Sequence, residues 1–300
     1  MQKQRKVLNV GLSIIGGFAL IGFIIGTFLD EKITGSLGNF DSVFGILFTL
    51  LAPVLALAIG EFAGALLFFM PKIENKTWDI ILRAIGAAAF VAFSVFAIKE
   101  GKEYVDFPRM AQNATTFKVL SITLVVLIDI GIILFVKLGM KHIDAKKIIP
   151  SVIVVFVIIA SWVFVSEVIK HLASRPRPRV VYSEPYFEFR NWYQFQPFLC
   201  LKDGYKECKS FVSGHTFIAA CSISSIPLML SLKKENSGIK MTIIGLAVGG
   251  VFSFVTAFSR IVAYAHFMSD VMGAIVASCA AQAIILNVAP LIHKKHTKSE

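Results

Sequence analysis

The sequence predicts an all-α fold class, a polytopic membrane helix bundle. Hydrophobic residues make up 56% of the 300 residues, charged residues make up 16%, and the mean hydropathy is +0.74. A soluble globular chain carries about 25% charged residues, so this chain lacks the polar surface that water requires. The composition excludes a soluble enzyme, a disordered chain and a nucleic-acid-binding domain. The formal net charge of +11 is assigned to cytoplasmic loops and to a site for an anionic ligand.

Eight apolar stretches have the length of a membrane-spanning helix, which needs about 20 mainly apolar residues. They cover about 7–29, 45–70, 79–98, 119–138, 150–169, 213–232, 241–258 and 267–288. The first is longer than the apolar core of a cleaved signal peptide and is expected to stay as a membrane helix. Asp129, near the middle of the fourth stretch, is expected either to hydrogen-bond across the bundle or to serve a function.

The placement of Lys and Arg predicts that both termini face the cytoplasm, because short cytoplasmic loops of membrane proteins are enriched in these residues. In that orientation the cytoplasmic pieces, with 15 Lys and Arg in 45 residues, are 1–6, 71–78, 137–147, 233–240 and 289–300. The opposite side carries a similar number over nearly twice the length. The protein is therefore expected to be a multi-pass protein of the cell membrane, with its two long loops, 99–118 and 170–212, on the extracytoplasmic side.

The loop 170–212 is rich in aromatic residues, which suit the membrane–water interface. It is expected either to lie on the lipid headgroups or to act as a lid over a lipid substrate. It also holds Cys200 and Cys208, which a disulfide either joins or leaves free. Cys221 and Cys279 lie in apolar stretches and are expected to be packing residues.

Three short polar clusters fall at the extracytoplasmic ends of the predicted helices. They are Lys170 with Arg177-Pro178, then Ser213-Gly214-His215, then Ser259-Arg260 with His266 and Asp270. Lys170, Arg177 and Arg260 suit phosphate oxygens in charge and geometry. Ser213 and Gly214 open a predicted helix, whose N-terminal N–H groups attract anions. Together the clusters predict a phosphate-binding cradle.

Two histidines and one carboxylate in these clusters predict phosphoryl-transfer chemistry. His266 and Asp270 are four residues apart, so on a helix they share one face. The carboxylate would hold the Nδ1–H and leave Nε2 as the nucleophile. His215 would protonate the leaving alkoxide and then take a proton from water. Each residue alone is more typical of a headgroup contact or an interfacial anchor, but three clusters on one side favour a catalytic site.

These residues resemble the three-part signature of the type 2 phosphatidic acid phosphatase superfamily, the membrane lipid phosphate phosphatases. The signature reads Lys-x6-Arg-Pro, then Pro-Ser-Gly-His, then Ser-Arg-x5-His-x3-Asp. The first and third parts match in full, and the second departs only at Val212, where the family has proline. Proline would pre-set the turn into the helix. Valine removes no catalytic group, so the geometry of the helix start is expected to survive.

The resemblance implies a six-helix phosphatase core, with both termini cytoplasmic and the site on the outer face. The core would occupy 79–300, and 1–78 would be an N-terminal two-helix membrane extension of unassigned role. His266 would form a phosphohistidine, His215 would act as acid and then base, and Asp270 would orient His266. The phosphate would be bound by Lys170, Arg177, Ser213, Gly214 and Arg260.

The predicted function is an integral membrane phosphatase that hydrolyses lipid phosphate monoesters or diphosphates through the phosphohistidine. Substrates of the phosphatidic acid, phosphatidylglycerol phosphate or undecaprenyl diphosphate type all fit, since the motifs bind phosphate rather than the lipid tail. The resemblance implies no metal and no cofactor. The expected partners are the phospholipid or polyprenyl phosphate substrate and membrane lipids, with no nucleic acid, and the oligomeric state is open. The alternatives are a lipid phosphotransferase using the same site, a multi-pass transporter, and an inactive family member that acts as a binding protein.

Overall fold

The structure, a computed structural model, describes residues 2–100, 113–139, 145–232 and 238–296. In these ranges the regular secondary structure is helical, with no strand. The α-helices are α1 (Gln2–Leu37), α2 (Val43–Phe69), α3 (Lys76–Glu100), α5 (Ala114–Gly139), α6 (Ala145–Ala173), α7 (Pro178–Ser183), α8 (Gly214–Cys221), α9 (Ser225–Ser231), α10 (Gly238–Val262) and α11 (Met268–His296). Two short 3-10 turns accompany them, η3 (Leu199–Leu201) and η4 (Ser222–Ser224).

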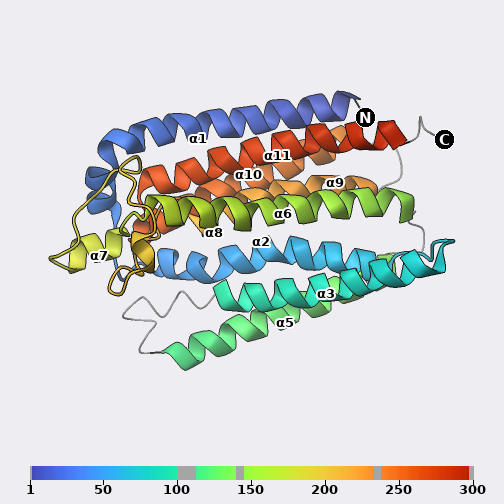
Figure 1. The fold of residues 1–300 in the computed structure, drawn as a ribbon. Coiled ribbons are helices and arrows are strands. Elements are labelled where there is room, and N and C mark those ends of the chain that lie inside the picture. The colour runs from blue at the N-terminus through green and yellow to red at the C-terminus, as the bar shows by residue number, and fades with distance from the viewer. Residues whose placement is uncertain (1, 101–112, 140–144, 233–237, 297–300) are drawn as a thin grey trace.

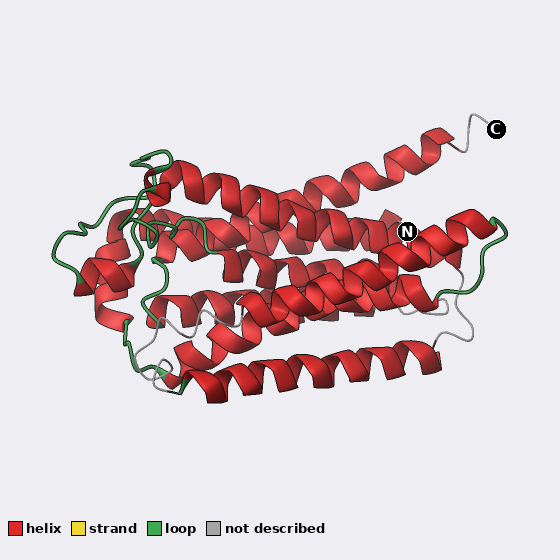
Figure 2. Cartoon of the chain, turned by 60° about the horizontal axis from the view of Figure 1, so that its bottom comes forward, coloured by secondary structure: helices red, strands yellow, loops and turns green. Residues whose placement is uncertain are grey.

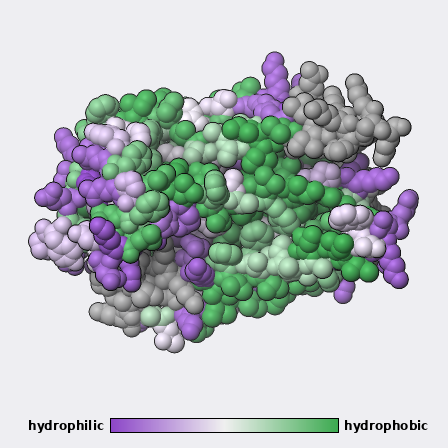
Figure 3. All heavy atoms as spheres, viewed as in Figure 1, coloured by the Kyte–Doolittle hydropathy of each residue, from purple (hydrophilic) through white to green (hydrophobic). Residues whose placement is uncertain are grey.

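Eight segments of the described chain are long and apolar enough to cross a membrane, and each overlaps one of the eight predicted stretches. Helix α8, the turn η4 and helix α9 form one of them, Gly214–Ser231. Figure 3 shows hydrophobic side chains over the middle of the bundle and hydrophilic side chains at both of its ends. The predicted all-α membrane bundle is confirmed, and the chain is an integral membrane protein.

Helix α2 lies in the interior of the bundle. It contacts α3, α5, α6, α8 and α10, and buried residues occur along its whole length. Helix α1 packs against α10 and α11 on one side, whereas α3 and α5 lie on the other (Figures 1 and 2). The division of the chain at residue 78 stays a prediction, but the packing does not set α1 and α2 apart from the later helices.

Two glycines bring α2 and α3 into backbone contact. A Cβ atom at Gly64 would lie 2.8 Å from the carbonyl oxygen of Gly86, and one at Gly86 would lie 2.7 Å from that of Gly64. Small residues allow membrane helices to pack closely where lipid supplies no hydrophobic driving force. Helix α3 is joined to α5 in turn, because Ser94 Oγ donates to Asp129 Oδ1 at 3.1 Å. Asp129 thus hydrogen-bonds across the bundle, one of its two predicted roles.

Helix α1 continues past the predicted end of the first span at residue 29 and ends at Leu37. The prediction followed the apolar run, which stops at Asp30. The helix continues because Asp30 is buried and hydrogen-bonded within the protein instead of facing water. At 36 residues, α1 is roughly 54 Å long, and the hydrocarbon core of a bilayer is about 30 Å thick. The last turns of α1 therefore extend toward the long loop.

The loop 170–212 folds over the end of the bundle that lies opposite both termini (Figure 1). Helix α6 continues into it as far as Ala173, and α7 and η3 follow. Arg190 Nη2 donates to the carbonyl oxygen of Ser174 at 2.6 Å, and Trp192 Nε1 donates to Thr27 Oγ1 of α1 at 3.0 Å. These bonds hold the loop against α6 and α1. Most of the other long loop, 99–118, lies outside the described residues.

All four cysteines are buried free thiols. Cys200 and Cys208 pack with Phe187 in a small apolar cluster within the loop, and no disulfide joins them. Burial raises the pKa of the Cys208 thiol to about 11, so it is protonated at neutral pH. Cys221 and Cys279 lie in the packed helices, as predicted.

Candidate active site

The three polar clusters meet at the end of the bundle opposite both termini (Figure 1). The first follows α6, the second opens α8, and the third joins α10 to α11. The backbone N–H of Ser213 donates to the carbonyl oxygen of Asp270 at 3.2 Å and joins the second cluster to the third. The Nζ atom of Lys170 lies 3.2 Å from the position that a Cβ would take at Gly214, which joins the first cluster to the second.

The second cluster forms the N-terminus of α8. Ser213 is the N-cap residue, and its Oγ accepts hydrogen bonds from the N–H of Thr216 at 3.4 Å and from Thr216 Oγ1 at 3.1 Å. The peptide bond that precedes Val212 is cis. With Ser213 as its cap, the helix begins at Gly214, although Val212 stands where the family has proline. His215 follows in the first turn and is buried.

His266 is buried just before α11, and Ser210 orients its ring. The Nδ1 atom lies 2.8 Å from the carbonyl oxygen of Ser210, so we assign the Nδ1 proton to this hydrogen bond. The Nε2 atom then keeps its lone pair. Asp270 Oδ2 is 3.8 Å from Nδ1, which is too far for a direct hydrogen bond. The carbonyl of Ser210, rather than the expected carboxylate of Asp270, is therefore the hydrogen-bond partner of Nδ1.

Asp270 contacts the imidazole of His266 through Ser210, whereas the sequence predicts a direct contact. The prediction assumed that both residues lie on one helix, but His266 precedes Met268, the first residue of α11. Asp270 Oδ2 instead accepts from the N–H of Phe267 at 2.8 Å and from Ser210 Oγ at 2.5 Å. The carboxylate thus satisfies an N–H at the start of α11 and holds the residue that orients the ring.

His266 is neutral at physiological pH. Burial lowers the pKa of its imidazole to about 4; the Asp270 carboxylate opposes this, and the positive charges of Arg177 and Arg260 add to it. A neutral imidazole with a lone pair on Nε2 is the form that a nucleophile requires.

The two arginines predicted to bind phosphate are held from different elements. Arg177 Nε lies 4.0 Å from Glu207 Oε2, and the same oxygen is 2.7 Å from Arg179 Nη2. Arg260 is fully buried, and its Nη1 donates to Thr49 Oγ1 of α2 at 2.6 Å. Guanidinium groups held in fixed directions are suited to binding phosphate oxygens.

Lys170 belongs to α6, and its Nζ reaches the start of α8. The same Nζ forms an ion pair with Glu167, 3.0 Å from Oε1. Beside it, Trp162 Nε1 lies 3.7 Å from the Cβ position of Gly214. Trp162 is 7% exposed, and no hydrogen-bond acceptor of the described residues meets its Nε1. This donor is not predicted by the sequence, because a tryptophan within an apolar stretch gives no signal of its own.

Arg175 and Asp30 form a buried ion pair that the sequence does not predict. Arg175 Nη2 is 2.9 Å from Asp30 Oδ2, and Nη1 is 2.6 Å from Asp270 Oδ1. Arg175 stands in the basic segment between Lys170 and Arg177, and Asp30 directly follows an apolar run. Both charges were visible in the sequence, but no spacing indicated that they pair.

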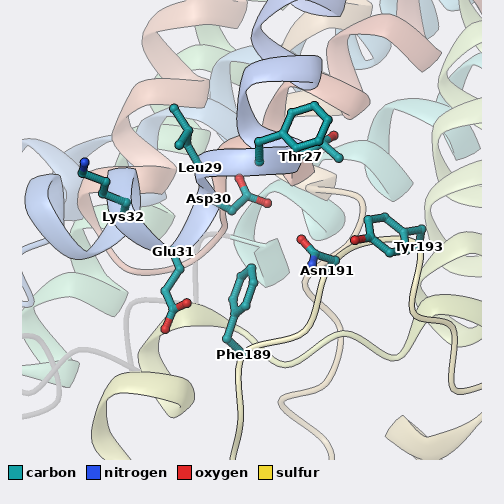
Figure 4. A pocket seen from close by; sticks show the side chains of 9 residues that line it. Thr27, Leu29, Asp30, Glu31, Lys32, Phe189, Asn191 and Tyr193 are labelled. Carbon is teal, nitrogen blue, oxygen red and sulfur yellow. The ribbon is translucent and has the colours of Figure 1, made fainter.

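A cavity of about 380 Å³ lies between the end of α1 and the long loop (Figure 4). Leu29, Asp30 and Lys32 line it from α1, and Phe189 and Tyr193 line it from the loop. It therefore adjoins the ion pair of Asp30. No group of three or more His, Cys, Asp or Glu residues suited to a metal ion occurs within the described ranges. The absence of a metal from the mechanism stays a prediction.

The fold and the site define an integral membrane protein with a buried, cation-lined histidine at one end of a helix bundle. Residues 151–293 match the family model of the PAP2 superfamily, which confirms the predicted resemblance. The matched residues make up slightly less than half of the chain, and the match supports a membrane phosphatase type of fold. The matched residues contain all three clusters but neither α1 nor α2. Neither the curated proteins nor the solved structures include a match to the chain.

Proposed function

We propose that the protein is a membrane phosphatase that hydrolyses a lipid phosphate monoester or diphosphate through a phosphohistidine at His266. The observation that carries the proposal is the hydrogen bond from Nδ1–H to the carbonyl of Ser210, because it leaves Nε2 as a nucleophile beside cationic side chains. The PAP2 superfamily match supports a phosphoric ester hydrolase.

In the first step, Nε2 of His266 attacks phosphorus and the bond from phosphorus to the leaving oxygen breaks. Protonated His215 gives its proton to that oxygen, so the lipid leaves as an alcohol or as a shorter phosphate. Lys170, Arg177 and Arg260 bind the non-bridging oxygens, whose negative charge is spread over three atoms in the transition state. The N-terminus of α8, with Ser213 and Gly214, is proposed to add backbone donors and a favourable helix dipole.

The phosphorylated imidazole of His266 carries a positive charge that a neutral histidine lacks. The buried carboxylate of Asp270 stabilises this charge at short range, and it holds Ser210 in place as the acceptor of Nδ1–H. Asp270 therefore supports the intermediate without taking the proton.

In the second step, water attacks the phosphohistidine. His215, now neutral, takes a proton from the water as the new oxygen–phosphorus bond forms and the phosphorus–nitrogen bond breaks. Inorganic phosphate leaves, His266 returns to its neutral form, and His215 is protonated again for the next turnover.

The substrate is proposed to be a lipid because the candidate site lies at one end of a membrane bundle, beyond the apolar middle of its helices (Figure 3). Phosphatidic acid, phosphatidylglycerol phosphate and undecaprenyl diphosphate remain the substrate types to compare. In the proposed orientation, both termini lie in the cytoplasm and the site lies on the extracytoplasmic face of the cell membrane. Cysteine accessibility to a membrane-impermeant reagent, with single cysteines placed in the long loop and near the N-terminus, tests this orientation.

The test of function is phosphate release by the purified full chain in detergent, over a panel of lipid monoesters and prenyl diphosphates. We expect release in the presence of EDTA and inhibition by vanadate, which resembles the pentacoordinate phosphorus. His266→Ala should abolish release, and His215→Ala should stop or trap the reaction at the phosphoenzyme. His171→Ala is the matched control, because this partly exposed histidine neighbours Lys170 and lies outside the proposed machinery.

Normal turnover in His266→Ala would contradict the phosphohistidine mechanism, whichever substrate is used. The same assay separates a hydrolase from a phosphotransferase when candidate lipid or sugar acceptors are added. A hydrolase yields inorganic phosphate in proportion to the lipid product, whereas a transferase yields a phosphorylated acceptor.

A further inference from the structure

We propose that Asp30 of helix α1 is a positioning residue of the active site and acts on Asp270 through Arg175. The inference rests on the proposed function, since it concerns how the charge of His266 is stabilised. It assigns a role to helix α1, which lies outside the residues that match the PAP2 superfamily model.

Within the described residues, Asp30 accepts three hydrogen bonds, all from Arg175 and Ser269 beside Asp270. Its Oδ1 accepts from the backbone N–H of Ser269 at 2.8 Å. Its Oδ2 accepts from Arg175 Nη2 at 2.9 Å and from the hydroxyl of Ser269. The side chain is 1% exposed. A buried carboxylate persists only where partners compensate its charge, and here those partners adjoin Asp270.

Hydrogen bonds hold the guanidinium of Arg175 at its edges, and aromatic rings pack against its faces. Nη1 donates to Asp270 Oδ1 at 2.6 Å, and Nε donates to the carbonyl oxygen of Arg190 at 2.6 Å. The rings of Phe267 and Phe189 lie 4.3 Å and 5.4 Å from its Cζ. Arg175 is therefore a rigid link, and a change at Asp30 is transmitted to Asp270 instead of being absorbed by side-chain motion.

The net charge of Asp30, Arg175 and Asp270 gives the reason for a second carboxylate near His266. Arg175 by itself would neutralise Asp270, and a neutral pair stabilises a neighbouring cation poorly. With Asp30 on its other edge, the group of two carboxylates and one guanidinium keeps a net charge of −1. This charge is available when His266 becomes a phosphorylated imidazolium, in a buried site where charge interactions are strong.

The close approach of α1 to the site depends on a glycine one turn before Asp30. A Cβ atom at Gly26 would lie 2.6 Å from the backbone nitrogen of Ser269 and 3.0 Å from Asp30 Oδ1. Only glycine allows the two backbones to come this close. Gly26 and Asp30 therefore place the carboxylate directly against the start of α11.

The test compares Asp30→Asn with Glu31→Gln in the phosphate-release assay. The first removes the buried charge and keeps the side-chain shape, and the second makes the same change at an exposed neighbour. We expect Asp30→Asn to lower kcat by about 10- to 100-fold, with KM within about twofold of wild type because the phosphate-binding cations are untouched. Glu31→Gln should keep both constants.

A double variant separates positioning from a general structural role. If Asp30 acts through Asp270, then Asp30→Asn should cause no further loss of kcat in an Asp270→Asn background. Losses that multiply in the double variant, or a wild-type kcat in Asp30→Asn, would overturn the inference. If Asp30→Asn does not purify as a monodisperse protein, Ser269→Ala replaces it in the same cycle. Ser269→Ala removes the hydroxyl that donates to Asp30 Oδ2 and accepts from Arg175 Nη1. The loss of kcat that it causes should likewise be absent in the Asp270→Asn background.

His266→Ala is assayed in the same experiment, so that failure of the proposed function can be distinguished from failure of the role of Asp30. Activity in His266→Ala equal to that of wild type removes the proposed function and this inference with it. Loss of activity in His266→Ala, with none in Asp30→Asn, removes only the role of Asp30.

Discussion

The guanidinium of Arg260 donates from Nη1 to Thr49 Oγ1 at 2.6 Å, although 211 residues separate the two in the chain. Thr49 lies in the interior helix α2, and its own hydroxyl proton goes to the carbonyl oxygen of Gly45 at 2.8 Å. The hydroxyl oxygen therefore faces Arg260 as an acceptor with a fixed direction. Helix α2 thus contacts the candidate site through one polar side chain, as α1 does through Asp30.

Replacing Thr49 by valine should weaken substrate binding, because valine keeps the shape but removes the acceptor of Arg260. Loss of a hydrogen bond to a charged group costs about 1.5 kcal/mol or more, so kcat/KM should fall about tenfold, mainly through KM. Steady-state kinetics on purified protein measure this. Thr49→Ser keeps the hydroxyl and should retain the wild-type constants. Equal kinetics for the valine and serine variants would show that this bond does not orient Arg260 for binding.

Replacing Trp162 by phenylalanine should lower the affinity for phosphate analogues. The indole Nε1 lies beside Lys170 and the start of α8, and phenylalanine retains most of the packing while removing the donor. One neutral hydrogen bond contributes about 1 kcal/mol, so the inhibition constant of vanadate should rise roughly fivefold. Trp78→Phe is the matched control, because Trp78 is exposed on α3. If the two variants bind vanadate alike, Nε1 of Trp162 does not contact the ligand.

The stability of the protein should fall at acid pH because of His266. Its pKa is about 4 when folded, against an ordinary value of 6.5. Between these values the unfolded chain binds a proton that the folded protein excludes. The contribution of neutral His266 to the free energy of unfolding is therefore fully present above pH 6.5 and is lost as the pH falls toward 4. The free energy of unfolding lost in this way is roughly 3 kcal/mol at pH 4.

Unfolding of the wild type and of His266→Gln in detergent, followed from pH 7.5 to pH 4.5, measures this contribution. We expect the wild type to lose more stability than the variant over that interval. Parallel curves would show that His266 does not exclude the proton in the folded state.

Replacing Gly26 by alanine should displace helix α1 from the start of α11. The added Cβ would lie 2.6 Å from a backbone nitrogen of Ser269, and backbone yields less readily than a side chain. We expect a loss of about 1 to 3 kcal/mol of stability together with reduced kcat, read from thermal unfolding and phosphate release. Gly17→Ala is the control, since nothing lies within 4 Å of its Cβ position on the same helix. A comparable loss in both variants would point to helix α1 in general instead of to the contact at Ser269.

The membrane spans were predictable because the lipid imposes a local and uniform requirement. A segment that crosses the bilayer must be apolar over about 20 residues and must pair its backbone groups internally, so composition along the chain reveals it. The end of α1 was misjudged for the same reason. Asp30 interrupts the apolar run, and a buried charge that is compensated by a partner looks like a helix end in the sequence.

The residues proposed for phosphoryl transfer were also visible in the sequence, because the three motifs are short and each lies at the end of a span. Their partners were not. Ser210, as the acceptor of the His266 proton, and Thr49, as the acceptor of the Arg260 proton, belong to segments with no motif. A hydroxyl or a carbonyl becomes specific only when another element brings a donor within hydrogen-bond distance.

By itself, the sequence determined the eight apolar spans, which the described residues contain, and it predicted a phosphate-binding histidine site from three motifs, since hydrophobic length and motif spacing are properties of the chain. The tertiary structure decided that α1 and α2 each bring one polar side chain to the residues of that candidate site, Asp30 to Arg175 and Thr49 to Arg260. It did so because the partner of a buried charge depends on how helices are packed and in which register, and this is set by contacts between residues more than 200 positions apart.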